Sequence, residues 1–262
     1  MINGDYFHEL TNFLNRKNLQ IITALSQDII YNSPYSNEKE NLESVKDSLL
    51  EFRNWVDINH ANMKPMNLVK ERDNSLRAGE ALILLKLDGR DVLLPFAFAL
   101  NVNADKKINE IRFYHSYWPI ESQHHLRPNL FPLDKEASRI PLDILKYHTA
   151  LNEGNIQQVL TLFADDGSVR EPSGGISGPG HESKLEDFFS RTLKDGGVSL
   201  VYHTIVDDGT RCAAEYSCTK WGPTEIPSQA GIEFFDRVSE GETSLFKAVR
   251  IYDDIEQPKP KT

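Results

Sequence analysis

In the second half of the chain, apolar residues first recur at helical spacing and then alternate as in strands. Two helical runs lie on either side of Gly154 and Asn155, namely Ile144, Tyr147, His148 and Leu151, then Ile156, Val159, Leu160 and Phe163. A short strand, SVREP, stops at Pro172, and a third helix is expected around 182–194. Beyond a glycine pair, four segments predict strands: 198–206, 210–221, 230–238 and 244–254. Helices followed by a run of strands indicate an α+β unit with a mostly antiparallel sheet.

The first half repeats this order. It predicts helices near 5–15, 17–26 and 39–55, and strands near 26–34, 66–73, 79–87, 90–102 and 107–117. A displacement of 138 residues relates the halves, because it places Asp166 on Asp28 near the start and Tyr252 on Tyr114 at the end. A register kept at both ends predicts a duplicated unit.

Four segments follow from this repeat. We expect a first domain over 1–118, a linker over 119–141, a second domain over 142–256 and a disordered tail over 257–262. The linker has no apolar period, and its stretch 121–141 contains three prolines.

The composition of the chain limits which binding partners and which cellular location are expected. The 29 Lys and Arg residues against 39 Asp and Glu residues give a net charge of −10, which disfavours nucleic acid and anionic membrane surfaces. Cys212 and Cys218 would stand about 20 Å apart in one strand, too far to form a disulfide, so reduced thiols and a cytoplasmic location are expected. No stretch approaches the roughly 20 apolar residues that span a bilayer, and the amino terminus shows no targeting segment.

Several sequence segments of the second half resemble the NTF2-like superfamily, in particular its SnoaL-like and ketosteroid isomerase-like members. They are KYHTALNEGNI, FADDGSVREP, the glycine-bearing turn before the third helix and the closing VRIYDD. The first half fits through LSQDIIYNSP and INEIRFYHSYW. The resemblance implies two tandem cones, each a curved, mostly antiparallel sheet packed on three helices around an apolar pocket. It also implies an internal pseudo-dimer through the sheets, with a higher oligomer left open.

The resemblance also implies candidate site residues. Ketosteroid isomerases place a tyrosine on the first helix and an acid before the proline of the first strand, and these positions hold Tyr147 and Glu171. Such a pair suits proton transfer next to a carbonyl, because a carboxylate takes the proton while a hydroxyl stabilises the enolate oxygen. The second acid of that family falls on Phe234, with Glu233 and Asp236 expected on the other face of the strand.

Other residues extend or weaken this interpretation. Asp253 is a candidate cavity acid of a SnoaL-like cyclase, although an acid at a strand end is often solvated. Tyr147 is equally suited to be a core residue, and Glu171 to be a solvated one. The repeat places Glu9 and Ser33 of the first copy opposite Tyr147 and Glu171. The first copy is therefore expected to have a degenerate site with an apolar interior, and its weak acid–base candidate is His115, which aligns with Asp253.

The leading hypothesis is a cofactor-independent isomerase, cyclase or dehydratase that acts on a largely apolar carbonyl compound, with no metal. One alternative is a non-catalytic small-molecule binding or scaffolding protein of the same fold. Another is an epoxide hydrolase or cyclase like the fused enzymes of polyether biosynthesis, which pair the acid before the proline with a carboxylate on the next strand. That strand has Tyr202 and His203 but no carboxylate, so the pair is not formed at the matching positions.

Overall fold

The computed structural model describes residues 5–34, 36–71, 75–240 and 243–255. The chain divides into two compact units, Met1–Gln123 and His124–Thr262. Each unit contains its own mixed sheet and its own hydrophobic core. The two are therefore described separately.

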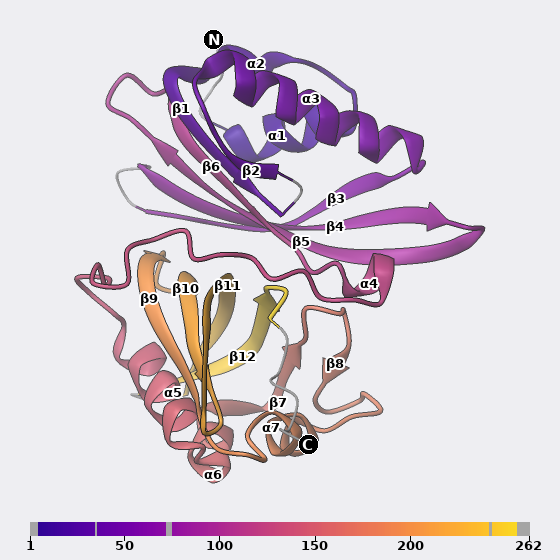
Figure 1. Cartoon of the computed structure of the whole chain (residues 1–262). Coiled ribbons are helices and arrows are strands. Elements are labelled where there is room, and N and C mark those ends of the chain that lie inside the picture. The colour runs from indigo at the N-terminus through magenta and orange to yellow at the C-terminus, as the bar shows by residue number, and fades with distance from the viewer. Residues whose placement is uncertain (1–4, 35, 72–74, 241–242, 256–262) are drawn as a thin grey trace. The chain divides into compact units, whose positions relative to one another are not determined.

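The first unit is a six-stranded sheet with its first three helices along one face (Figure 1). Its helices are α1 (Tyr6–Leu14), α2 (Gln20–Thr23), α3 (Leu42–Ile58) and α4 (Trp118–Glu121). Its strands are β1 (Leu25–Ser33), β2 (Ser36–Glu40), β3 (Asn62–Lys70), β4 (Leu76–Leu87), β5 (Arg90–Val102) and β6 (Ile108–Tyr114). The strand order is β2-β1-β6-β5-β4-β3, in which only the β1–β6 pair is parallel among the described pairings.

The second unit repeats this topology. Its helices are α5 (Leu142–Glu153), α6 (Ile156–Leu160) and α7 (Leu185–Thr192). Its strands are β7 (Phe163–Arg170), β8 (Ile176–Ser177), β9 (Val198–Asp207), β10 (Arg211–Trp221), β11 (Thr224–Glu240) and β12 (Thr243–Tyr252). The order β8-β7-β12-β11-β10-β9, with a parallel β7–β12 pair, matches the first unit strand for strand. The α+β class and the tandem NTF2-like architecture predicted from the sequence are confirmed.

The ends of the helices follow from local sequence. Asp5 caps α1 by accepting a hydrogen bond from the His8 backbone N–H at 3.0 Å, and Asn41 caps α3 in the same way through Ser44. Helix α5 ends at Gly154, whose φ of 67° is the left-handed conformation that glycine adopts without strain. The turn after α5 is therefore sharp, and it returns the chain to α6.

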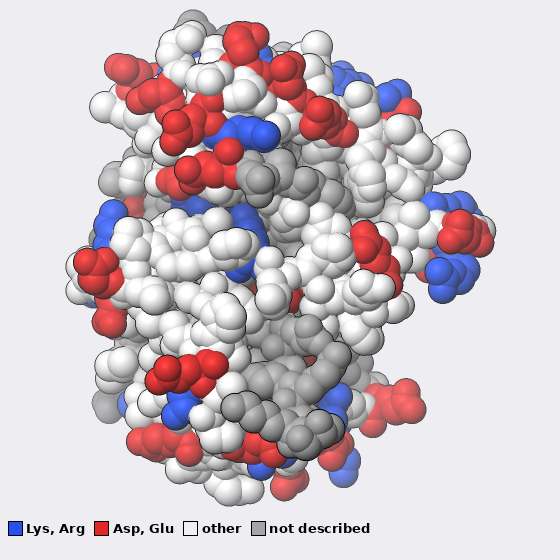
Figure 2. All heavy atoms as spheres, in the orientation of Figure 1, with Lys and Arg blue, Asp and Glu red and all other residues white. Residues whose placement is uncertain are grey.

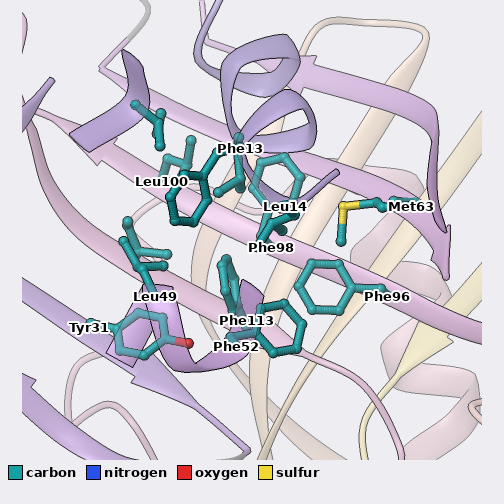
Figure 3. Packing of buried hydrophobic residues seen from close by; sticks show 14 of the residues in the cluster. Phe13, Leu14, Tyr31, Leu49, Phe52, Met63, Phe96, Phe98, Leu100 and Phe113 are labelled. Carbon is teal, nitrogen blue, oxygen red and sulfur yellow. The ribbon is translucent and has the colours of Figure 1, made fainter. Parts of the chain in front are cut away.

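The core of the first unit is filled by aromatic rings (Figure 3). Phe52, Phe96, Phe98 and Phe113 are all buried, and the Phe96 and Phe113 ring centroids lie 5.0 Å apart in an edge contact. Edge contacts of this kind add to the stability that burial already gives. The interior of the first unit around these rings is thus apolar.

Several segments differ from the sequence expectations. The second helix of the first unit is short, because β1 already begins at Leu25, and neither β2 nor β8 was expected. The unit boundary, after Gln123, falls within the segment expected to be a linker. Most of that segment belongs to the second unit, where the Ala137 N–H donates to the Tyr202 carbonyl at 2.7 Å. The expected tail over 257–262 lies outside the described residues.

Acidic side chains, interspersed with basic ones, cover both units on the face drawn in Figure 2. Such mixing is ordinary for a protein surface, so the argument from net charge about partners stays a prediction. None of the helices in the described ranges has the length and apolarity needed to cross a bilayer.

Candidate functional site

A buried carboxyl group, Glu233, lies inside the second unit. Glu233 is 3% exposed and sits on β11, where its Oε2 accepts a hydrogen bond from the Tyr202 hydroxyl at 3.1 Å. Burial and the nearby charge of Asp253 raise the pKa of Glu233 to about 8, although the Tyr202 bond opposes this. Glu233 is therefore mostly protonated at neutral pH and acts as a hydrogen-bond donor or acid.

The sequence placed Glu233 on the wrong face of its strand. Glu233 shares the core face of β11 with Gly231 and Phe235, while Phe234 points to the opposite face and contacts Tyr252. The error arose because 230–238 carries apolar residues on both faces, so alternation alone does not fix which face is buried. The sequence signal that could have identified Glu233 as a site residue is an acidic residue within an otherwise apolar strand.

A second carboxylate, Asp253, follows the end of β12. Its Oδ2 accepts a hydrogen bond from the Tyr216 hydroxyl at 2.5 Å. Burial raises the pKa of Asp253 to about 6, against the effect of bonds from Tyr216 and the Ile255 backbone N–H. The residue keeps part of its surface accessible although protein surrounds its carboxylate. Asp253 is thus ionised at neutral pH and can accept a proton.

Tyr216 reaches Asp253 by crossing a strand at a glycine. Tyr216 on β10 pairs directly with Gly231 on β11, and Asp253 lies beyond β11 at the end of β12. A Cβ atom at Gly231 would stand 2.5 Å from the Tyr216 hydroxyl oxygen. Only glycine therefore leaves room for the tyrosine side chain to cross.

Tyr147 also lies in this interior, on α5. It is 1% exposed, and its ring makes edge contacts with Phe235 and Phe246, both at 5.6 Å between centroids. Burial and the charge of Glu233 raise the pKa of Tyr147. No hydrogen bond to its hydroxyl is formed within the described ranges. Tyr147 is thus a neutral donor close enough to Glu233 to sense its charge.

His148, next along α5, supports the tyrosine that holds Glu233. Its Nε2 accepts a hydrogen bond from the Leu200 backbone N–H at 3.3 Å, and its ring contacts Tyr202 edge-on at 5.3 Å. Burial lowers the pKa of His148. This histidine is therefore a neutral packing partner of Tyr202.

Glu171 lies apart from these groups. It follows the end of β7, where its Oε1 accepts a hydrogen bond from Arg191 at 3.1 Å and its side chain is 26% exposed. Glu171 was expected to point into the apolar interior, but its carboxylate instead contacts Arg191 at a partly exposed position. The structure brings Tyr147 and Asp253 together with Glu233, and leaves Glu171 with Arg191.

Gln229 continues the same face of β11. It pairs with Cys218, a core residue, and is 3% exposed. Within the part of the chain that the structure describes, its buried Oε1 has no hydrogen-bond partner. A buried acceptor of this kind costs free energy unless something donates to it, so Gln229 is a candidate ligand contact.

Strand pairing shows what replaces these groups in the first unit. Glu233 pairs with Ile251 and Phe98 with Phe113, which are equivalent by the 138-residue repeat, so Phe98 takes the place of Glu233. By the same register, Phe96 and Ala81 take the places of Gly231 and Tyr216. His115, at the place of Asp253, is buried and its ring lies 5.0 Å from that of Tyr117. The first unit therefore lacks both tyrosine–carboxyl pairs.

Other chemistry has less support. In the described part of the chain, no group of three or more His, Cys, Asp or Glu side chains is placed to hold a metal ion. Cys212 and Cys218 are free and buried on β10, and burial raises the pKa of Cys218 to about 12. Neither thiol is a ready nucleophile.

One family model and several solved structures match parts of this chain. A search of curated proteins found no match. Among solved structures, an NTF2-like protein of unknown function from Cytophaga hutchinsonii is 11% identical, covering 42% of this chain and 95% of its own, with a TM-score of 0.35. The epoxide hydrolase/cyclase-like enzyme SalBIII is 12% identical over 42% of this chain and 86% of its own (TM-score 0.34). A putative polyketide cyclase from Xanthomonas campestris pv. campestris is 10% identical, with 42% and 84% covered and a TM-score of 0.34.

The family model described as the SnoaL-like domain matches residues 144–243. This range begins in α5 and runs to the start of β12, so it spans Tyr147, Tyr202, Tyr216 and Glu233. The second unit is therefore similar to the SnoaL-like domain over residues 144–243.

Proposed function

We propose that the second unit is a cofactor-independent proton-transfer enzyme that acts on a largely apolar carbonyl compound, as an isomerase, cyclase or dehydratase. One observation carries this proposal: two interior carboxyl groups, Glu233 and Asp253, each accept a hydrogen bond from a buried tyrosine, and burial raises their pKa values to about 8 and about 6. At neutral pH the first holds its proton and the second does not. Such a pair supplies an acid and a base in one interior.

Each group then has a role. Asp253 removes a proton next to the substrate carbonyl, and Glu233 and Tyr147 donate hydrogen bonds to the oxygen that becomes negative. Tyr202 and Tyr216 position the two carboxyl groups. Gln229 accepts a hydrogen bond from a donor elsewhere on the substrate. Glu171 stays a candidate for proton transfer at the surface side of the domain, where it contacts Arg191.

A test of proton abstraction does not need the natural substrate. The full chain is incubated in D₂O with a panel of apolar ketones, and exchange of the hydrogens next to the carbonyl is followed by proton NMR. We expect exchange of at least one ketone, lowered about 10²-fold or more in Asp253→Asn, the usual scale for a lost general base. Exchange should be fastest between pH 6 and 8, where Asp253 is ionised and Glu233 is protonated.

Two control variants separate the candidates. Asp165→Asn changes an exposed acid of β7 and should leave exchange unchanged. Glu171→Gln distinguishes the two possible bases, since a loss there with full activity in Asp253→Asn would transfer the role to Glu171. Ketones that bind without any exchange would favour the binding or scaffolding alternative.

The same carboxyl pair favours a second candidate, the opening of an epoxide. A protonated Glu233 can donate to the epoxide oxygen while Asp253 activates a water or hydroxyl nucleophile. Incubation of an epoxide panel in ¹⁸O-labelled water, with products read by mass spectrometry, tests it. This reaction would be supported over ketone exchange if the parent protein incorporates the label or closes a ring and both Glu233→Gln and Asp253→Asn fail to do so.

The proposed setting is the cytoplasm, because both cysteines are free thiols. The proposed partner is an apolar small molecule. Mass spectrometry of molecules that co-purify with the protein tests the ligand directly.

A further inference from the structure

The chain segment that enters the second unit is fastened next to Asp253. Asp254 is buried, and its two oxygens hold the segment at neighbouring residues: Oδ1 contacts His124 Nδ1 at 2.8 Å and Oδ2 accepts from the His125 backbone N–H at 2.7 Å. The exposed fractions of the His124 and Asp254 side chains are 26% and 3%. A hydrogen bond to a carboxylate so shielded from water is stronger than one at the surface.

The same segment also extends the sheet. The Ala230 N–H of β11 donates to the Arg127 carbonyl at 3.2 Å, and Pro128 bridges to Gln229 in the antiparallel sense. The last residue of β12, Tyr252, pairs with Ile232. The segment therefore contacts β11 just beyond the point where β12 ends and Asp253 begins.

Asp253 and Asp254 are neighbours whose side chains go to different places. Asp253 bonds Tyr216 in the domain interior, whereas Asp254 bonds His124 on the entering segment. Because the two share a backbone, holding Asp254 in place also fixes the direction in which Asp253 points.

The pair also acts on Asp253 through its charges. Burial is the main cause of the raised pKa of Asp253, and the Asp254 carboxylate raises that pKa further, while a charge on His124 lowers it. The charged or titratable groups that bond Asp253 or interact with its charge are Tyr216 and Cys218 on β10, Glu233 on β11, Asp254 after β12 and His124 on the entering segment. The balance of Asp254 and His124 thus bears directly on the candidate base.

We propose that the His124–Asp254 pair is a positioning element of the second-unit site, which aims the Asp253 carboxylate into the interior and is electrostatically coupled to it. The importance of this element for catalysis rests on the proposed function. Its effect on Asp253 does not, and can be measured without a substrate.

The experiment is an NMR titration of the full chain labelled with ¹³C at the aspartate carboxyl carbons. Asp253→Asn identifies the Asp253 signal. His124→Asn keeps a donor near Asp254 but removes the cation, so the titration midpoint of Asp253 should move to higher pH. Adding Asp254→Asn to that variant removes the anion as well, while its amide oxygen can still accept from His125, and the midpoint should move back down.

The reversal in sign separates a charge effect from a loss of packing, because damaged packing would accumulate in the double variant. His181→Asn, on an exposed turn before α7, is the matched control and should leave the midpoint unchanged. An unmoved midpoint in His124→Asn, or a further rise in the double variant, would overturn the proposal. If the titration midpoints move as expected but the protein exchanges no ketone hydrogens, only the proposed function is rejected.

Discussion

The proton on Glu233 changes how the stability of the protein depends on pH. The ordinary pKa of this side chain, 4.5, applies to the unfolded chain, and burial raises it to about 8 in the folded state. Between these values the folded state binds a proton that the unfolded state has released. The free energy of unfolding contributed by this group therefore falls as pH rises, by at most about 1.4 kcal/mol for each pH unit.

We predict that Glu233→Gln weakens this dependence. Glutamine keeps an acceptor for Tyr202 and has no proton to lose, so the variant should be more stable than the parent at pH 9 and closer to it at pH 5. Scanning calorimetry from pH 5 to pH 9 measures the difference. Glu186→Gln, an exposed change on α7, should decline in parallel with the parent. The same parallel decline in Glu233→Gln would show that Glu233 is not a buried acid.

At the scale of elements, the crossing of β11 by Tyr216 depends on one missing side chain. We predict that Gly231→Ala displaces the Tyr216 ring, because the new Cβ atom would lie 2.5 Å from its hydroxyl oxygen. The expected cost is about 1–3 kcal/mol of unfolding free energy, the usual range for overpacking a core. Loss of the Tyr216 hydrogen bond should also raise the pKa of Asp253. Urea denaturation and the aspartate titration measure the two effects.

A matched glycine provides the control. At Gly175 a Cβ atom would have its nearest contact 3.7 Å away, at Glu171, which is an ordinary van der Waals distance. Gly175→Ala should therefore change stability little and leave the Asp253 titration as it is. Equal losses in the two variants would mean that the crossing tolerates a side chain.

The elements of each unit were largely predictable, whereas the site was predictable only in part. Apolar spacing located the long helices and the strands of both sheets, since those residues bury one face. It missed β2 and β8, which are short and lie at the sheet edges. Tyr147 and Asp253 were named from sequence, but the inward face of Glu233 depends on strand pairing, and the contacts of Tyr216 depend on residues distant in the chain.

At the scale of the whole molecule, the duplication leaves two units with different interiors. One is filled by phenylalanine rings and the other holds two tyrosine–carboxyl pairs. On each sheet, the face opposite the core carries apolar residues beside buried charged ones. Ala97 and Ala99 on β5 pair with Glu80 and Arg112, and Ile232 and Phe234 on β11 pair with Glu215 and Arg250. We propose that these faces associate as an internal pseudo-dimer.

The pseudo-dimer predicts that the units stay together after the chain is cut. A site for a specific protease is inserted at Ser122, and the cut protein is analysed by size-exclusion chromatography. We expect the two fragments to elute together, at the volume of the uncut chain. Separate elution of two folded fragments would reject the association.

The strand register that relates the two interiors also shows which residues of the first unit to change in order to rebuild the second-unit site there. The large–small pair Phe96–Ala81 in one unit corresponds to the small–large pair Gly231–Tyr216 in the other, so exchanging both members conserves the volume shared by the two strands. Together with Phe98→Glu and His115→Asp, that exchange would place the polar groups of one copy on the backbone of the other. The first unit, which has the same strand order and an aromatic interior, is thus a scaffold on which a second specificity could be built.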